Sequence, residues 1–179
     1  MKKLILGSAI VAVLGVASNA MAAPNSGTVN FTGSVSTATC DLSLKDSSGG
    51  DISNVNLGVL SNTSTTNGTA VQFKLVPQDR GCLAKNSANI AWTSSTLGNA
   101  GISNATTTGG TNAYLLLSAA NATQRGDAAV IKNGQTSFDY SVTSGGIQSF
   151  DYNAVLAKPS GTLTAGPFSA SASYVVTYK

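Results

Sequence analysis

The chain has 179 residues, of which 10 are Lys or Arg and 7 are acidic; it contains no His, and its formal net charge is +3. Because the chain has no His and all of its acidic residues are Asp, the composition excludes His-based catalytic triads and acid–base pairs built on Glu. The charge is too small to indicate a nucleic-acid partner.

The first 22 residues have the organisation of a secretory signal peptide. Lys2 and Lys3 form a basic start, residues 4–17 an apolar core, and residues 20–22 a small-x-small cleavage motif. A membrane anchor is the alternative, but the apolar core has 14 residues and a spanning helix needs about 20. We therefore expect an exported protein whose mature chain begins at Ala23 and forms one domain.

An alternating segment follows the leader. Residues 25–36 carry Val29 and Phe31 in the middle of one face and polar residues at the even positions. This period of two predicts a β-strand, which by itself is an ordinary amphipathic first strand.

Two cysteines, Cys40 and Cys82, are present. An even pair in an exported protein predicts one disulfide, which would close a loop of 43 residues. A redox-active pair is the alternative, but the close Cys-x-x-Cys spacing is missing.

Short strands separated by turns rich in Gly, Ser and Asn fill the middle of the chain, and no segment after the leader has a sustained helical period. This pattern predicts an antiparallel β-sandwich. Residues 94–110 form an unusually long loop, either a ligand site or a surface excursion. We favour the excursion because the loop has no charged or aromatic residue. The expected strands are residues 39–44, 54–60, 71–75, 88–93, 113–119 as a central strand, 129–131, 136–140 and 147–158.

The last stretch, residues 168–179, alternates most clearly. Its apolar residues occupy the even positions, and it would span about 40 Å as a strand. No later segment could pair with its second edge, so we expect another chain to cover that edge. The even-numbered residues are Phe168, Ala170, Ala172, Tyr174, Val176 and Tyr178.

Little in the sequence points to catalysis or metal binding. A two-Asp hydrolase is the alternative to a non-enzymatic role, but Asp is common in turns for backbone reasons. Zinc and copper need imidazole or several thiolates, and residues 46–51 lack the spaced ligands of a calcium loop. We expect no enzyme, no metal and no cofactor. The carboxylates are Asp41, Asp46, Asp51, Asp79, Asp127, Asp139 and Asp151.

The two ends of the chain resemble the pilin subunits of bacterial chaperone–usher fimbriae. The sequence G-T-V-N-F-T-G-S-V at residues 27–35 resembles the donor strand and first domain strand of that family. Gly166, fourteenth from the end, and the penultimate Tyr178 match its terminal signature. G-C-L-A-K at residues 81–85 and I-Q-S-F-D-Y at residues 147–152 are similar to thin fimbriae whose major subunit is an adhesin for sialylated glycolipids.

The resemblance implies an incomplete immunoglobulin-like β-sandwich, completed in trans by a donor strand. Residues 1–22 would be the signal peptide, residues 23–33 the donor extension and residues 34–179 the pilin domain. The first strand after Gly33 would form the second wall of the groove. The implied donor residues are Asn25, Gly27, Val29, Phe31 and Gly33. The implied acceptor and chaperone-binding residues are Gly166, Phe168, Ala170, Ala172, Tyr174, Val176, Tyr178 and Lys179.

The implied partners are neighbouring copies in a fibre, a periplasmic chaperone, an outer-membrane usher and host glycoconjugates. The implied location is a fimbrium on the bacterial surface, reached through the periplasm. Receptor binding in the thin-fimbria subgroup is associated with basic residues late in the chain, where this sequence has Lys158. The alternative is a self-contained secreted carbohydrate-binding sandwich that uses residues 94–110.

Overall fold

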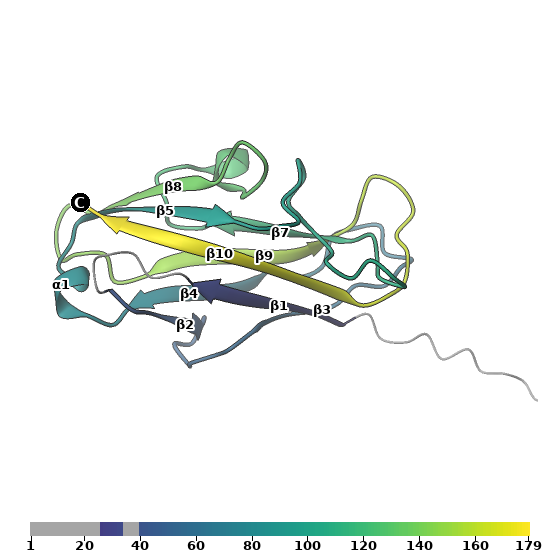
Figure 1. The fold of residues 1–179 in the computed structure, drawn as a ribbon, viewed down its shortest axis with the longest axis horizontal. Coiled ribbons are helices and arrows are strands. Elements are labelled where there is room, and N and C mark those ends of the chain that lie inside the picture. Colours follow the sequence, from purple (N-terminus) through teal and green to yellow (C-terminus); the bar gives the residue numbers. More distant parts are fainter. Residues whose placement is uncertain (1–25, 34–39) are drawn as a thin grey trace, which may run out of the picture.

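Two five-stranded sheets form a β-sandwich (Figure 1). The computed structural model describes the backbone of residues 26–33 and all of residues 40–179; the predicted signal peptide and Asn25 lie outside the described residues. The first sheet, called the β10 sheet, has the order β3 (Val55–Val59), β1 (Ser26–Gly33), β10 (Phe168–Tyr178), β5 (Ser87–Thr93) and β8 (Ser137–Ser141). The second, the β9 sheet, has the order β2 (Leu42–Asp46), β4 (Val71–Pro77), β9 (Phe150–Ala157), β7 (Tyr114–Ala119) and β6 (Ile102–Ser103).

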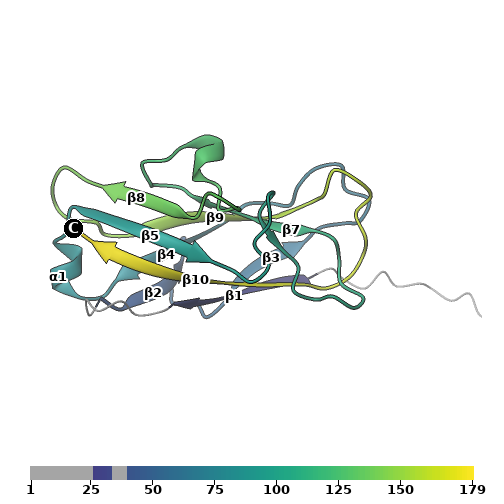
Figure 2. The same ribbon diagram turned by 45° about the horizontal axis from the view of Figure 1, so that its top comes forward.

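The core lies between the sheets and follows from the period-two pattern. β5 and β9 belong to different sheets of the sandwich (Figure 2). Burial alternates along both strands, so that Trp92 and Tyr152 face inward and meet edge to face, with ring centroids 5.1 Å apart. The Trp92 indole donates a hydrogen bond to the Tyr152 hydroxyl oxygen, and the Tyr140 hydroxyl donates a second one at 2.7 Å. The polar atoms of these aromatic residues are therefore satisfied inside the core. The predicted all-β, immunoglobulin-like sandwich is confirmed.

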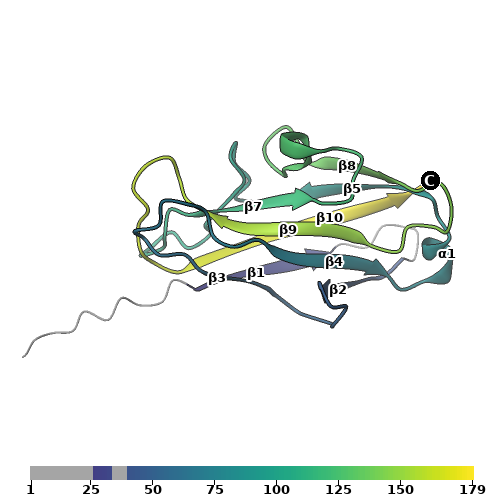
Figure 3. The ribbon, with the colours of Figure 1, turned by 180° about the vertical axis from the view of Figure 1, so that it is seen from behind.

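A short helix holds one end of the disulfide. α1 (Arg80–Leu83) begins after Asp79, whose carboxylate accepts a hydrogen bond from the Gly81 amide at 2.6 Å. Cys82 in α1 is bonded to Cys40, and their Cα atoms are 6.0 Å apart, which confirms the predicted pair. Figure 3 shows α1 at the end of the sandwich where β10 finishes. Within the described residues, no helix is long and apolar enough to cross a bilayer.

The predicted strand at residues 129–131 is wrong. A 3-10 helix, η1 (Gly126–Ala129), occupies its start, and Val130 makes only an isolated bridge with Ser118. Lys132 binds the carboxylate of Asp127 at 2.7 Å, which closes the segment into a turn. The apolar residues of segment 129–131 therefore anchor a loop and do not form a β-ladder with a neighbouring strand. The predicted central strand at residues 113–119 is present as β7, although β6 pairs with only its first two residues.

β1 lies between β10 and β3 and pairs with both (Figure 1). It runs parallel to β10, from Gly27 opposite Phe168 to Gly33 opposite Tyr174, and antiparallel to β3. In this structure, the strand that covers the second edge of β10 therefore comes from the same chain. The second wall of the groove is β3, in the place expected for the strand after Gly33, and residues 34–39 lie outside the described part.

The disulfide explains why β1 runs parallel to β10. Cys40 follows Gly33 by seven residues, which reach at most about 25 Å, and it is fixed to α1 at the far end of β10. β10 itself extends over about 33 Å. An antiparallel β1 would place Gly33 beside Phe168, beyond that reach. A subunit can thus fill its own groove only in the parallel direction.

Candidate functional site: the groove beside β10

The groove between β10 and β3 is the candidate functional site. Its inner wall consists of Phe168, Ala170 and Ala172, which are 3%, 1% and 2% exposed. Farther along β10, Tyr174 is half-buried and its ring centroid lies 5.4 Å from that of Trp92. The inward positions of β10 are those that the alternating sequence predicted.

The register places small residues opposite large ones along this wall. Gly27 is opposite Phe168 and Gly33 is opposite Tyr174, at the two ends of the pairing. Between them, Val29 and Phe31 are opposite Ala170 and Ala172 respectively. At each of these four positions, the register therefore sets a large residue of one strand opposite a small residue of the other.

The long loop of residues 94–110 covers the other edge of β10, beyond the end of β5. The Ala105 amide donates to the Ser169 carbonyl at 2.7 Å, and the Ser94 hydroxyl donates to the Ser171 carbonyl at 2.7 Å. The Asn104 side chain accepts from the Ser169 amide at 2.9 Å. The loop is thus an integral part of the β10 sheet and leaves the groove as the edge that β1 fills.

Gly166 lies against this loop, just before β10 begins. Its φ is +149°, and a Cβ atom there would lie 2.3 Å from the Gly109 carbonyl oxygen and 2.8 Å from the Thr111 amide nitrogen. Neither the backbone conformation nor the space allows a side chain. In this structure, Gly166 therefore allows the loop to pack directly against the start of β10.

Replacing Gly166 by Ala should lower the free energy of unfolding by about 2 kcal/mol or more, since strain and a backbone clash combine. Guanidinium denaturation of the purified subunit measures this. The matched control is Gly161→Ala, because a Cβ atom at Gly161 meets nothing within 4 Å and its φ is ordinary. The control should change stability by less than about 0.5 kcal/mol. Equal effects of the two substitutions would show that the contact between Gly166 and the loop does not exclude a side chain.

Tyr178, the last residue of β10, and Lys179 lie at the end of the sandwich near α1. The ring centroid of Tyr178 lies 6.1 Å from that of Phe150, and burial raises the pKa of Tyr178 to about 12. The Tyr178 hydroxyl is buried and has no hydrogen-bond partner among the described residues. The Lys179 side chain is exposed and lies 3.9 Å from Asp139, whose pKa is lowered chiefly by a hydrogen bond from Asn89.

Four of the carboxylates serve local structure. Asp46 accepts hydrogen bonds from two amides of its own turn, and Asp51 pairs with Lys45. Asp79 caps α1, and Asp127 pairs with Lys132. Within the described residues, no group of three or more His, Cys, Asp or Glu side chains is placed to hold a metal ion.

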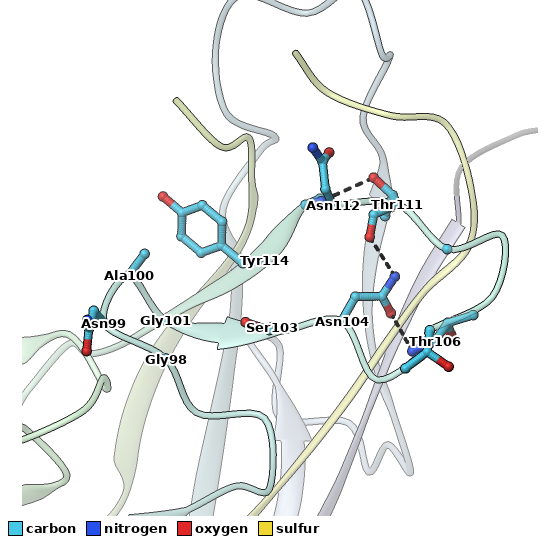
Figure 4. A pocket seen from close by; sticks show the side chains of 13 residues that line it. Gly98, Asn99, Ala100, Gly101, Ser103, Asn104, Thr106, Thr111, Asn112 and Tyr114 are labelled. Atoms are coloured by element: carbon cyan, nitrogen blue, oxygen red, sulfur yellow. Dashed lines mark hydrogen bonds between the residues drawn. The ribbon is translucent and has the colours of Figure 1, made fainter. Parts of the chain in front are cut away.

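A pocket of about 590 Å³ opens beside the loop (Figure 4). It lies between the turn around Gly101 and the start of β7, with the Tyr114 ring at its side. Lys158 does not line it: its ammonium group donates to the Pro159 carbonyl at 3.1 Å. The sequence-predicted receptor contact and this pocket are therefore separate features.

Two features of the site had no clear signal in the sequence. The loop of residues 94–110 was interpreted as a surface excursion because it has no charged or aromatic residue, and Asn104 lies in an unpatterned polar run. β3 showed only a short strand pattern, and nothing in it indicated that it faces β1. Pairing between distant segments of this kind depends on the tertiary fold.

Comparison with known proteins gives the family. No protein-family profile matches the chain. The chain is 37% identical to the K99 fimbrial protein of Escherichia coli over 188 aligned positions, which cover 99% of both chains. It is 33% identical to the F107 fimbrial protein of Escherichia coli, with both chains covered in full. With an alternating strand seated beside β10 and this similarity over its whole length, the chain belongs to the family of fimbrial proteins that includes K99 and F107.

Proposed function

We propose that this chain is a structural, non-enzymatic pilin that polymerises by donor-strand exchange into a fimbrium on the bacterial surface. Residues 1–22 direct export and are removed. Residues 23–33 are the donor extension, and residues 34–179 form the domain that receives a donor strand from the next subunit. The fibre serves adhesion to host cells.

The observation that carries the proposal is the position of β1, inserted between β10 and β3. Without β1, these two strands would expose unpaired amide and carbonyl groups along facing edges. The inward face of β10, which includes Ala170 and Ala172, would lose its cover. The domain therefore requires an added strand, and pilins are a known case of such strand addition.

The sequences of both partners suit a donor that arrives from another subunit. The donor positions 27, 29, 31 and 33 read G-V-F-G, and the acceptor positions 168, 170, 172 and 174 read F-A-A-Y. In either direction, the donor pattern reads small, large, large, small, and the acceptor pattern reads large, small, small, large. An antiparallel donor would place Gly33 opposite Phe168 and Phe31 opposite Ala170, so small residues would still meet large ones.

A donor from a neighbour is free of the tether at Cys40 that fixes the direction within one chain. Because antiparallel pairing is slightly more stable per residue, we expect the neighbour's strand to insert antiparallel. Donation from head to tail does not close on itself, so it generates an open filament.

Before assembly, a periplasmic chaperone lends the missing strand, and an outer-membrane usher exchanges it for the donor. The end of β10, with Lys179, is the site at which the chaperone holds the subunit. Host glycoconjugates are the expected receptors of the fibre, and Lys158 is the basic residue proposed to contact them.

Cysteine cross-linking between two differently labelled chains tests the exchange. One chain carries Thr28→Cys and the other Ser173→Cys, the position opposite Thr28 in the antiparallel register. Paired residues of this kind approach closely enough for a disulfide. Co-expressed chains should give a covalent dimer containing one of each.

The control acceptor is Ser169→Cys, which is opposite Thr28 in the parallel register of this structure. It should give little cross-linking between chains. Placed together on one chain, Thr28→Cys and Ser169→Cys should form an internal bond in the closed subunit. No bond between chains with either acceptor would contradict donor-strand exchange, and preferential linkage to Ser169→Cys would contradict the antiparallel direction.

A further inference from the structure

We propose that the pocket beside residues 94–110 binds an uncharged saccharide. The pocket lies outside the groove, so the proposal does not rest on donor-strand exchange. Its volume of about 590 Å³ is in the range of small-molecule sites. None of its lining residues carries a charge; they include Asn99, Ser103, Thr106, Thr107 and Tyr114.

The wall of the pocket is held by one side chain, Asn104. Its amide nitrogen donates to the carbonyls of Thr111 and Pro167 at 2.8 and 2.9 Å. Its amide oxygen accepts from the amides of Thr106 and Ser169 at 3.0 and 2.9 Å. All four contacts are to the backbone, so Asn104 joins the later part of the loop to the start of β10. Figure 4 shows its hydrogen bonds with Thr106 and Thr111.

A second Asn holds the opposite side. Asn112 donates to the Thr162 carbonyl at 2.9 Å and accepts from the Thr164 amide at 2.9 Å. The Thr111 hydroxyl donates to the Thr164 carbonyl. The pocket is thereby organised before any ligand arrives, which lowers the entropic cost of binding.

Other polar groups of the lining remain available. The hydroxyls of Ser103, Thr106, Thr107 and Tyr114 make no hydrogen bond within the described part of the chain. In Figure 4, the Tyr114 ring stands between Ala100 and Asn112, at the side of the pocket. A Cβ atom at Gly101 would lie 2.3 Å from the Leu115 carbonyl oxygen and 3.1 Å from this ring, so a Gly at this position allows the loop to approach β7 closely.

This set of groups matches the chemistry of a sugar. Hydroxyl groups both donate and accept, as the hydroxyls of a saccharide require. The aromatic ring offers an apolar surface for the C–H face of a pyranose while its hydroxyl stays polar. The lining has no cation to balance a carboxylate or sulfate, and an anionic ligand would lose hydration there without compensation. These features favour an uncharged saccharide.

Immobilised lactose, N-acetyllactosamine and mannobiose, with sialyl-lactose as the charged counterpart, are suitable probes. The full chain, purified after export, should bind at least one uncharged probe. Tyr114→Ala should weaken this binding at least tenfold. Because that substitution could also disturb β7, the loop pair Thr106→Val and Thr107→Val is tested as well and should weaken binding several-fold.

The matched control is Thr143→Val, which removes an exposed hydroxyl in the connection from β8 to β9 and should leave binding unchanged. The proposal is overturned if no uncharged probe binds, if sialyl-lactose binds better than lactose, or if the pocket variants bind as well as the control. Cross-linking between Thr28→Cys and Ser173→Cys chains, repeated with Tyr114→Ala, should be unchanged. That readout separates failure of the pocket from failure of fibre assembly.

Discussion

Replacing Phe31 by Asp is expected to reduce SDS-resistant oligomers of the exported chain at least tenfold. Phe31 is opposite Ala172 in the parallel register and would be opposite Ala170 in the antiparallel one. Both Ala side chains are at most 2% exposed. A carboxylate delivered to either position would be desolvated without a partner, which costs several kcal/mol. The burial of Val29 and Phe31, worth roughly 3 to 6 kcal/mol, would be halved at the same time.

Unheated samples of surface extracts on SDS gels give the measurement, with Asn30→Asp as the matched control. Asn30 is adjacent in sequence but is opposite Ser171, which is exposed on the outer face of β10. Its new charge would stay in water, so the ladder should persist. A ladder of normal intensity from Phe31→Asp would show that the odd-numbered positions do not fill the groove.

Removing the disulfide by Cys40→Ser together with Cys82→Ser should lower the free energy of unfolding of the subunit by about 4 kcal/mol. The bond closes a loop of 43 residues in the unfolded chain, and the chain-entropy account gives this value for such a loop. Cys82 is 4% exposed, so the substitution also leaves a hydroxyl in a buried place. Denaturant unfolding of the chaperone-free subunit provides the measurement.

Reduction of the unchanged chain with a thiol provides the control, since it breaks the bond without altering composition. It should account for most of the loss. A change below about 1 kcal/mol on reduction would mean that the bond does not restrict the unfolded state, and that another feature must hold residue 40 near α1.

The sequence predicted those parts of the fold that repeat locally. Period-two alternation identified β10 and β9 within one residue of the observed limits at most ends, because one face of each strand is buried. The same rule failed at residues 129–131, where three residues are too few to distinguish a strand from a loop anchored by Ile131. The cysteine pair was predicted from its number and the leader.

The two strands of the candidate site, β1 and β10, were predictable separately, but the direction in which they pair was not. The alternating segments around Val29 and Ala170 were both recognisable, and their register matches small residues with large ones. The parallel direction within one chain was not predictable, since it depends on the distance from Gly33 to the disulfide. The close packing of Gly166 against the loop is a contact between segments more than 50 residues apart, for which no local pattern exists.

The most direct test of the account is the folding of a subunit that lacks residues 23–33, prepared without a chaperone. We predict that it shows no cooperative unfolding transition and aggregates. A synthetic peptide of residues 25–33 should restore the transition in a concentration-dependent way, and the same peptide with Phe31→Asp should not. A trimmed subunit that is soluble and unfolds cooperatively without any peptide would contradict the claim that the domain requires an added strand.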